Sequence, residues 1–463
     1  MDEQFQPPRH DTSDMPPLIP QTSNLKRTSA GVVLSWILII GAIAFVFLQT
    51  QTDFSKTESV ETPGNFAPDF SLRMPGKYIV GINSLLGRQF ALKSLDQMAQ
   101  NLQKDQNIRN QLCFVPVLAE VSGRESALDD LERLRTNSAA GGIKDELQSF
   151  QDLYEHDGTR LSEQQRNAIE KCGWFGRLAL SHDKDASDPE REAALKSAIR
   201  TVFVMGILSM AVVAGLISGL ILLTIAVVFW SKGRLRGRLA IPETPHPSLL
   251  ESFAVYIAGF MAFPALIALL APRFSLGASI LAILCIIFSI FWPRIRGANW
   301  KEYRMAIGWH RGRGFFREIG CGIVGYLAGL PLLVLALAFV LLLSRLTTGA
   351  TPAHPIVDQV NRDTFFFIFV LACVWAPVIE ETFFRGMLFG YLRRRHSWVF
   401  SSVLSALLFA LVHPQGLLGL PAIGTIGFIM SAIREWRGSL IASMSAHALN
   451  NGSVTLLLIL TLD

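Results

Sequence analysis

The sequence has few charged residues for its length. Only 17% of its 463 residues are charged, whereas soluble domains carry about 25%. Half of the residues (50%) are hydrophobic and the mean hydropathy is +0.36, which excludes an ordinary soluble protein. The formal net charge is +5, but its basic residues cluster beside apolar runs and form no basic face with interleaved aromatics. We therefore expect an integral membrane protein that does not bind nucleic acid.

The sequence also lacks the common redox and zinc motifs. Its five cysteines contain no CxxC pair, and no HExxH pattern occurs. Three cysteines lie in apolar runs and are interpreted as small hydrophobic residues. Cys113 and Cys172 both lie in the one large polar region. They could form a disulfide if that region lies outside the cytoplasm, but nothing in the sequence shows that they meet.

Three segments precede the main apolar part. Residues 1–30 are expected to form a disordered cytoplasmic tail, because the first part is polar and has no apolar periodicity. Residues 31–48 form an apolar run without an evident cleavage site, which predicts an uncleaved membrane anchor. Residues 50–198 are polar, with leucines at helical spacing, and predict an inserted helical domain.

Residues 199–463 are expected to form a polytopic all-α membrane bundle of about nine spans, counting the anchor. Arginine and lysine residues concentrate in alternate loops, which predicts that these loops and the N-terminus are cytoplasmic. Residues 50–198 are then extracytoplasmic. We expect the protein to reside in a bacterial plasma membrane. The apolar runs from 199 onward are 202–230, 249–271, 275–292, 319–344, 364–392, 398–413, 417–433 and 439–461.

Three patterns within residues 364–463 place polar groups inside apolar spans. They are Glu380-Glu381-Thr382-Phe383-Phe384-Arg385, Phe409-Ala410-Leu411-Val412-His413 and His447-Ala448-Leu449-Asn450-Asn451. Ionisable groups at this depth cost about 2.5–3.5 kcal/mol each and usually mark function. At about 1.5 Å per residue, the three patterns lie about 15–22 Å from the basic loops. This common depth predicts one shared polar site.

The residue types in this site suit hydrolysis. Glu381 and Arg385 are four residues apart, so they are expected to form an ion pair that leaves Glu380 free as a general base. His413 could hold the attacking water, and His447 and Asn451 could donate hydrogen bonds to an oxyanion. Pro377 could kink the helix just before the pair. Glu380, His413 and His447 would also suit a zinc ion, although no motif spacing indicates one and no cofactor is certain.

The ordered patterns EExxxR, FxxxH and HxxxN resemble the CAAX protease and bacteriocin-processing family. This family includes type II CAAX prenyl endopeptidases and bacterial abortive-infection membrane proteins. The resemblance implies a helical intramembrane peptidase in which Glu380 and His413 activate water and His447 and Asn451 stabilise the oxyanion, with Glu381 and Arg385 at the remaining motif positions. It implies a peptide or membrane-protein substrate, either prenylated or bacteriocin-like, and leaves a metal open.

Two alternatives remain open from the sequence. The first is a transporter in which the carboxylates and histidines form a proton relay, although no internal repeat is evident. The second is a non-catalytic scaffold or immunity protein that retains the family fold. An intramembrane endopeptidase is the leading hypothesis because all the motif residues are present.

Overall fold

The computed structural model describes residues 29–57, 70–103, 107–136, 143–156, 161–235, 237–239, 247–263, 266–267, 275–346 and 364–461. All regular structure in these ranges is helical, as expected for an all-α membrane protein. Residues 1–28 of the expected tail lie outside the described ranges. The expected helical character of the polar insert is confirmed within them.

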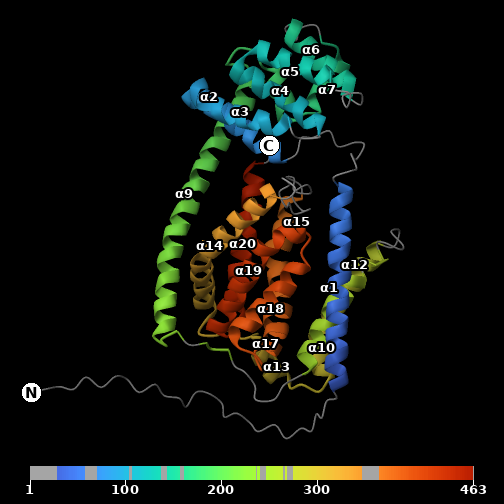
Figure 1. Cartoon of the computed structure of the whole chain (residues 1–463), viewed down its shortest axis with the longest axis vertical. Helices are drawn as coiled ribbons and strands as arrows, with labels where there is room; N and C mark the ends of the chain where they lie inside the picture. The colour runs from blue at the N-terminus through green and yellow to red at the C-terminus, as the bar shows by residue number, and fades with distance from the viewer. Residues whose placement is uncertain are drawn as a thin grey trace, which may run out of the picture.

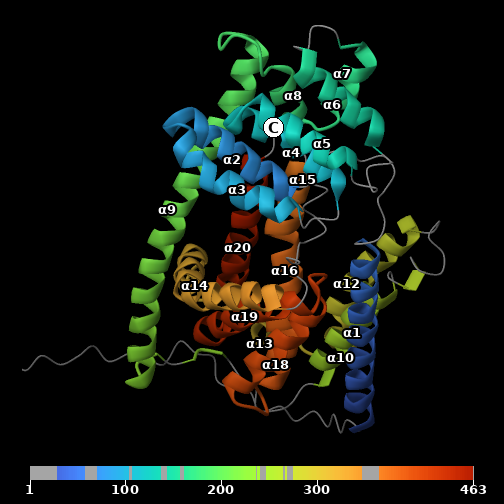
Figure 2. The same ribbon diagram turned by 45° about the horizontal axis from the view of Figure 1, so that its top comes forward.

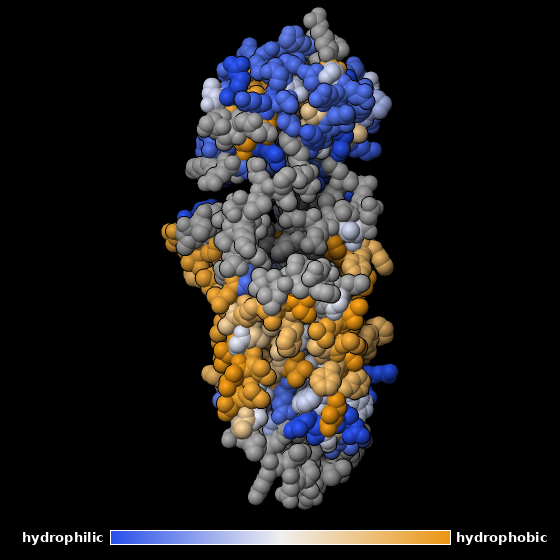
Figure 3. All heavy atoms as spheres, turned by 90° about the vertical axis from the view of Figure 1, so that its right-hand side faces the viewer, coloured by the Kyte–Doolittle hydropathy of each residue, from blue (hydrophilic) through white to orange (hydrophobic). Residues whose placement is uncertain are grey.

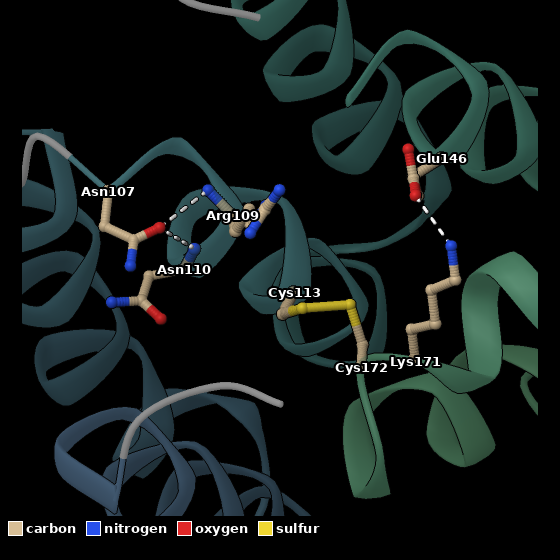
Figure 4. The surroundings of a disulfide bond; sticks show 7 residues. All are labelled: Asn107, Arg109, Asn110, Cys113, Glu146, Lys171 and Cys172. Atoms are coloured by element: carbon tan, nitrogen blue, oxygen red, sulfur yellow. Dashed lines mark hydrogen bonds and ion pairs between the residues drawn. A yellow bond between two sulfur atoms is a disulfide. The ribbon is translucent and has the colours of Figure 1, made fainter. Parts of the chain in front are cut away.

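The polar insert folds around its own apolar core. Its seven described helices are α2 (Phe70–Leu86), α3 (Arg88–Gln103), α4 (Ile108–Ser122), α5 (Arg124–Thr136), α6 (Lys144–His156), α7 (Glu163–Glu170) and α8 (Trp174–Leu180). Buried side chains such as Leu112, Phe150 and Trp174 form one continuous cluster. A disulfide joins Cys113 of α4 to Cys172, just before α8, with the Cα atoms 5.4 Å apart (Figure 4). The pairing that the sequence left open is therefore present.

A single long helix connects this unit to the bundle. Helix α9 (Pro189–Ser231) begins at Asp188, whose carboxylate accepts hydrogen bonds from the Glu190 and Arg191 backbone. In both ribbon views α9 runs from the polar helices along the side of the bundle (Figures 1 and 2). The predicted boundary at 198 therefore falls inside a continuous helix. Helix α9 thus begins with charged turns that precede the apolar run 202–230. The Asp188 cap sets the start of this helix, which lies before the first apolar residue of the run.

An ion-pair cluster fastens α4 to the start of α9. The Nη1 and Nη2 atoms of Arg191 donate to the Glu120 carboxylate at 2.8 and 2.6 Å. His182 Nδ1 lies 3.2 Å from the same carboxylate. Burial raises the pKa of Glu120, but the bonds from His182 and Arg191 outweigh burial and hold that pKa below its ordinary value of 4.5. The ionised cluster therefore fixes the polar helices against α9.

The remaining helices form the membrane bundle, with α13 and α17 at the end far from the polar helices (Figure 1). On the face that Figure 3 shows, the surface is largely apolar over the bundle and hydrophilic over the polar helices. The bundle helices are α1 (Ser29–Thr57), α10 (Pro247–Tyr256), η3 (Ile257–Ala262), α12 (Ser275–Ile295), α13 (Trp300–Ile307), α14 (Phe315–Leu346), α15 (Phe365–Val370), η6 (Leu371–Trp375), α16 (Ala376–Glu380), η7 (Glu381–Leu388), α17 (Phe389–Leu392), α18 (Trp398–Leu411), α19 (Gly416–Arg437) and α20 (Leu440–Thr461).

Helix lengths in the described ranges indicate an integral membrane protein. Five helical segments are long and apolar enough to cross a membrane, and three shorter apolar helices accompany them. The number of spans, about nine from the sequence, stays a prediction. Helix α18 has 14 residues, about 21 Å at the usual rise, so it is too short to cross about 30 Å of hydrocarbon.

Close helix contacts hold α20 in the bundle. A Cβ at Gly322 of α14 would come within 2.3 Å of the Ala442 carbonyl oxygen of α20, so only glycine allows this approach. Helices α18 and α19 are joined by a short turn and α19 contacts α14 and α20. This packing brings α16, the end of α18 and the middle of α20 around one site.

Candidate active site

The innermost part of the site is a fully buried ion pair between Glu381 and Arg385. Arg385 Nη1 donates to Glu381 Oε1 at 3.0 Å, and both side chains are 0% exposed. Arg385 Nη2 donates to the Gly427 carbonyl of α19 at 3.0 Å, and its guanidinium lies 4.4 Å from the Phe409 ring centre. The expected ion pair is present, and Phe409 packs against its cation. Each buried charge is thus compensated, as burial requires.

His447 joins the two adjacent carboxylates. Its Nδ1 lies 2.9 Å from Glu381 Oε1, and its Nε2 lies 3.7 Å from Glu380 Oε2. Because a carboxylate can only accept, Nδ1 donates its hydrogen to Glu381. This bond fixes the ring so that Nε2 faces Glu380. The sequence did not indicate a contact between His447 and Glu381.

Glu380 is the exposed member of the carboxylate pair. Its side chain is 23% exposed, and its buried Oε2 has no hydrogen-bond partner among the described residues. Tyr256 of α10 also has a buried hydroxyl without a partner there, and it interacts electrostatically with Glu380. Its ring stacks on Phe383 at 3.8 Å. No sequence motif marks Tyr256, which became part of the site only through helix packing.

His413 follows the end of α18. Its Nδ1 lies 2.6 Å from the Phe409 carbonyl oxygen, so Nδ1 carries the hydrogen and Nε2 is left as an acceptor in the neutral ring. The ring lies 4.3 Å from the Phe409 ring, which in turn lies 6.1 Å from the ring of His447. His413 also interacts electrostatically with Glu380. The three sequence patterns therefore meet in one place.

Two π-helical segments flank Glu380. In η6 the Ala376 N–H bonds the Leu371 carbonyl, five residues back. In the same register the Ala372 carbonyl would need an N–H from Pro377, which has none. Asn451 Nδ2 supplies the missing hydrogen bond at 2.8 Å. The expected effect of Pro377 therefore takes the form of a widened π turn, which is frequent at functional sites.

The geometry does not fit the expected metal set. Within the described ranges no group of three or more His, Cys, Asp or Glu residues is arranged to hold a metal ion. Glu380 lies 3.7 Å from His447, but these two residues and His413 do not form such a group. The possible zinc site is therefore not supported by the positions of its three ligands.

The sequence comparisons agree with this architecture. Fold and site together define a helical integral membrane protein with an intramembrane cluster of carboxylates and histidines. Residues 362–453 match the family model for type II CAAX prenyl endopeptidase Rce1-like proteins, which confirms the resemblance carried by the three motifs.

One curated relative is similar over a shorter stretch. An Escherichia coli protein described as an uncharacterized 24.3 kDa protein is 33% identical over 143 residues, which cover 27% of this chain and 63% of that protein. The chain thus spans less than two thirds of that relative's length. No solved structure matches this chain.

Proposed function

We propose that the membrane bundle is an intramembrane endopeptidase that hydrolyses a peptide bond with water activated by Glu380 and His413. The observation that carries this proposal is the division between two adjacent carboxylates. Glu381 is fully buried and paired with Arg385 and His447, whereas Glu380 is 23% exposed and lies 3.7 Å from His447 Nε2. Such a division gives one structural and one reactive carboxylate. The match of residues 362–453 to the Rce1-like family model supports the same chemistry.

Proton transfer follows from the hydrogen bonds. Glu380 accepts a proton from water while the acceptor Nε2 of His413 orients that water, and the resulting hydroxide adds to the substrate carbonyl carbon. The C–N bond then breaks, and Glu380 returns the proton to the leaving amine. For the oxyanion we propose the ring of His447 and the second amide hydrogen of Asn451, since its first serves Ala372.

The proposed substrate is a peptide or a membrane protein. The site lies inside an apolar bundle, so the substrate must present its cleavage point within or next to the lipid bilayer. A prenylated or a bacteriocin-like peptide would meet this requirement. We further propose that the protein resides in a bacterial plasma membrane, with its basic loops in the cytoplasm.

Comparative proteomics of membrane fractions tests this proposal. We expect peptides cleaved by the wild type to disappear with Glu380→Gln, because the amide keeps the size of the side chain but cannot accept the proton. Glu302→Gln is the matched control, since Glu302 is exposed on α13 outside the site. The control should cleave normally. Unchanged cleavage products in Glu380→Gln would overturn the proposal.

A further inference from the structure

A pocket opens at the basic end of the bundle, where the α13–α14 connection meets the turn between α19 and α20. Its volume is about 230 Å³. Its lining combines cationic and apolar side chains. The lining residues are Arg304, Gly308, Trp309, His310, Arg311, Leu440, Ile441 and Met444.

The two arginines at this pocket have no partner of their own. Arg304 and Arg311 are both exposed, and no ion pair or side-chain hydrogen bond involves either within the described ranges. The nearby carboxylate of Glu318 does not compensate them. It accepts Arg437 at 2.7 and 2.9 Å and the Arg313 backbone N–H at 3.0 Å. The pocket therefore carries uncompensated positive charge.

A buried arginine adds to this charge from behind the pocket wall. Arg434 of α19 is 0% exposed, and a Cβ at Gly308 would come within 2.6 Å of its Cζ atom. Its Nη2 donates to the Ala306 carbonyl, but Nε and Nη1 have no partner among the described residues. The adjacent Glu435 is held by Arg393 at 2.8 and 2.9 Å. A buried cation in this state favours an anion nearby.

Hydrogen bonds hold the pocket wall in place. Leu440 N–H donates to the Gly308 carbonyl at 3.0 Å, and Ser439 Oγ donates to the His310 carbonyl at 2.7 Å. His310 Nε2 lies 3.0 Å from the Gly438 carbonyl, while its Nδ1 accepts the Gly312 N–H. Burial, followed by the charge of Arg434, lowers the pKa of His310 below 6.5. The arginines are thus the cations that a ligand would meet.

The apolar surroundings indicate an amphiphilic ligand. Leu440, Ile441 and Met444 form the apolar side of the pocket. At the nearby start of α14, Phe315 and Phe316 are 50% and 84% exposed. The pocket is smaller than the 300–1,000 Å³ typical of drug-sized ligands, so it would hold a head group while acyl chains lie outside along the bundle.

We propose that this pocket binds the phosphate head group of an anionic phospholipid from the leaflet at the basic end of the bundle. Arg304 and Arg311 contact the phosphate. Arg434 does not touch it, but its positive charge, which lies directly behind Gly308, attracts the phosphate electrostatically. Positive-inside topology alone accounts for basic loops, but not for a hydrogen-bonded pocket backed by a buried, incompletely paired arginine. The proposal is independent of peptidase activity.

Native mass spectrometry of the purified full chain tests the proposal with phosphatidylglycerol and phosphatidylcholine as probes. We expect selective retention of phosphatidylglycerol. The double variant Arg304→Gln/Arg311→Gln should weaken phosphatidylglycerol binding about 25-fold, since each arginine near an anionic lipid raises the binding constant about fivefold. Arg294→Gln/Lys301→Gln removes the same charge from the same end outside the pocket and should retain the lipid. Ile441→Trp should displace the lipid without removing charge.

The source of the phosphate is tested by competition. Inorganic phosphate is added to the lipid-bound wild type, and lipid retention should persist because the acyl chains contribute to binding. Displacement of lipid by inorganic phosphate alone would assign the pocket to free phosphate and overturn the lipid proposal. Equal losses of lipid in the pocket pair and the control pair would also overturn it.

Discussion

Glu380 and Glu381 are adjacent in sequence but differ in their surroundings. The carboxylate of Glu381 accepts hydrogen bonds from Arg385 and His447, and both hydrogen bonds are buried away from water. Glu380 is partly exposed, and His447 Nε2 lies 3.7 Å from its Oε2. Adjacent residues can therefore have different surroundings, because about 100° of rotation about the helix axis moves the second side chain to another face.

Replacing each glutamate separately should divide stability from activity. Glu381→Gln leaves Arg385 buried without its counterion, so we expect a loss of about 3–5 kcal/mol in the free energy of unfolding. Glu380→Gln should change that free energy little while abolishing cleavage. Denaturant unfolding of the full chain in detergent measures the first effect, and cleavage of a membrane substrate measures the second. Similar destabilisation by both variants would contradict the division of roles.

At the scale of elements, the π turn at η6 depends on a distant helix. The Ala372 carbonyl loses its in-helix donor through the π register and Pro377, and Asn451 of α20 replaces it. Asn451 thereby links α20, which also carries His447, to the helix that carries Glu380. The bond fixes the relative position of two segments of the proposed active site, beyond any role at the oxyanion.

A double-mutant cycle tests this link. Asn451→Ala leaves the Ala372 carbonyl unpaired, so we expect a loss of about 1–3 kcal/mol in the free energy of unfolding. In Pro377→Ala the new backbone N–H can serve that carbonyl, so the double variant should lose less than the sum of the single losses. Denaturant unfolding of all four proteins measures the coupling. Additive losses would contradict the structural link between Asn451 and the Ala372 carbonyl. An Asn451→Ala variant that loses activity at full stability would also contradict it and would leave Asn451 with a role at the oxyanion only.

Sequence reasoning succeeded where local spacing decides the contact. Helices fill the predicted apolar runs within the described residues, and the four-residue spacing correctly paired Glu381 with Arg385. It failed where contacts join remote segments: His447 with Glu381 is 66 residues apart, and Asn451 with Ala372 is 79. The start of α9 at Pro189, before the predicted boundary at 198, could have been predicted from the sequence, since Asp188 followed by Pro189 is a typical helix start.

At the scale of the whole molecule, charge and disulfide chemistry indicate the same orientation. The basic α13–α14 and α17–α18 connections lie at the end of the bundle away from the polar helices (Figure 1). The polar helices contain the Cys113–Cys172 disulfide, which persists in oxidising compartments. Because α9 is continuous between the two ends, one orientation applies to both. We therefore propose that the polar helices are extracytoplasmic.

Thiol labelling of intact cells tests this orientation. In a background with Cys285, Cys321 and Cys373 replaced by Ala, Ser187→Cys adds an exposed thiol near the polar helices, and Lys301→Cys adds one at the basic end. We expect a membrane-impermeant maleimide to label Ser187→Cys in intact cells and Lys301→Cys only after lysis. The parent protein should remain unlabelled until it is both reduced and denatured, because Cys113 and Cys172 are joined and fully buried. The reverse labelling pattern would place the polar helices in the cytoplasm, and labelling of the unreduced parent would show that the disulfide does not form in cells.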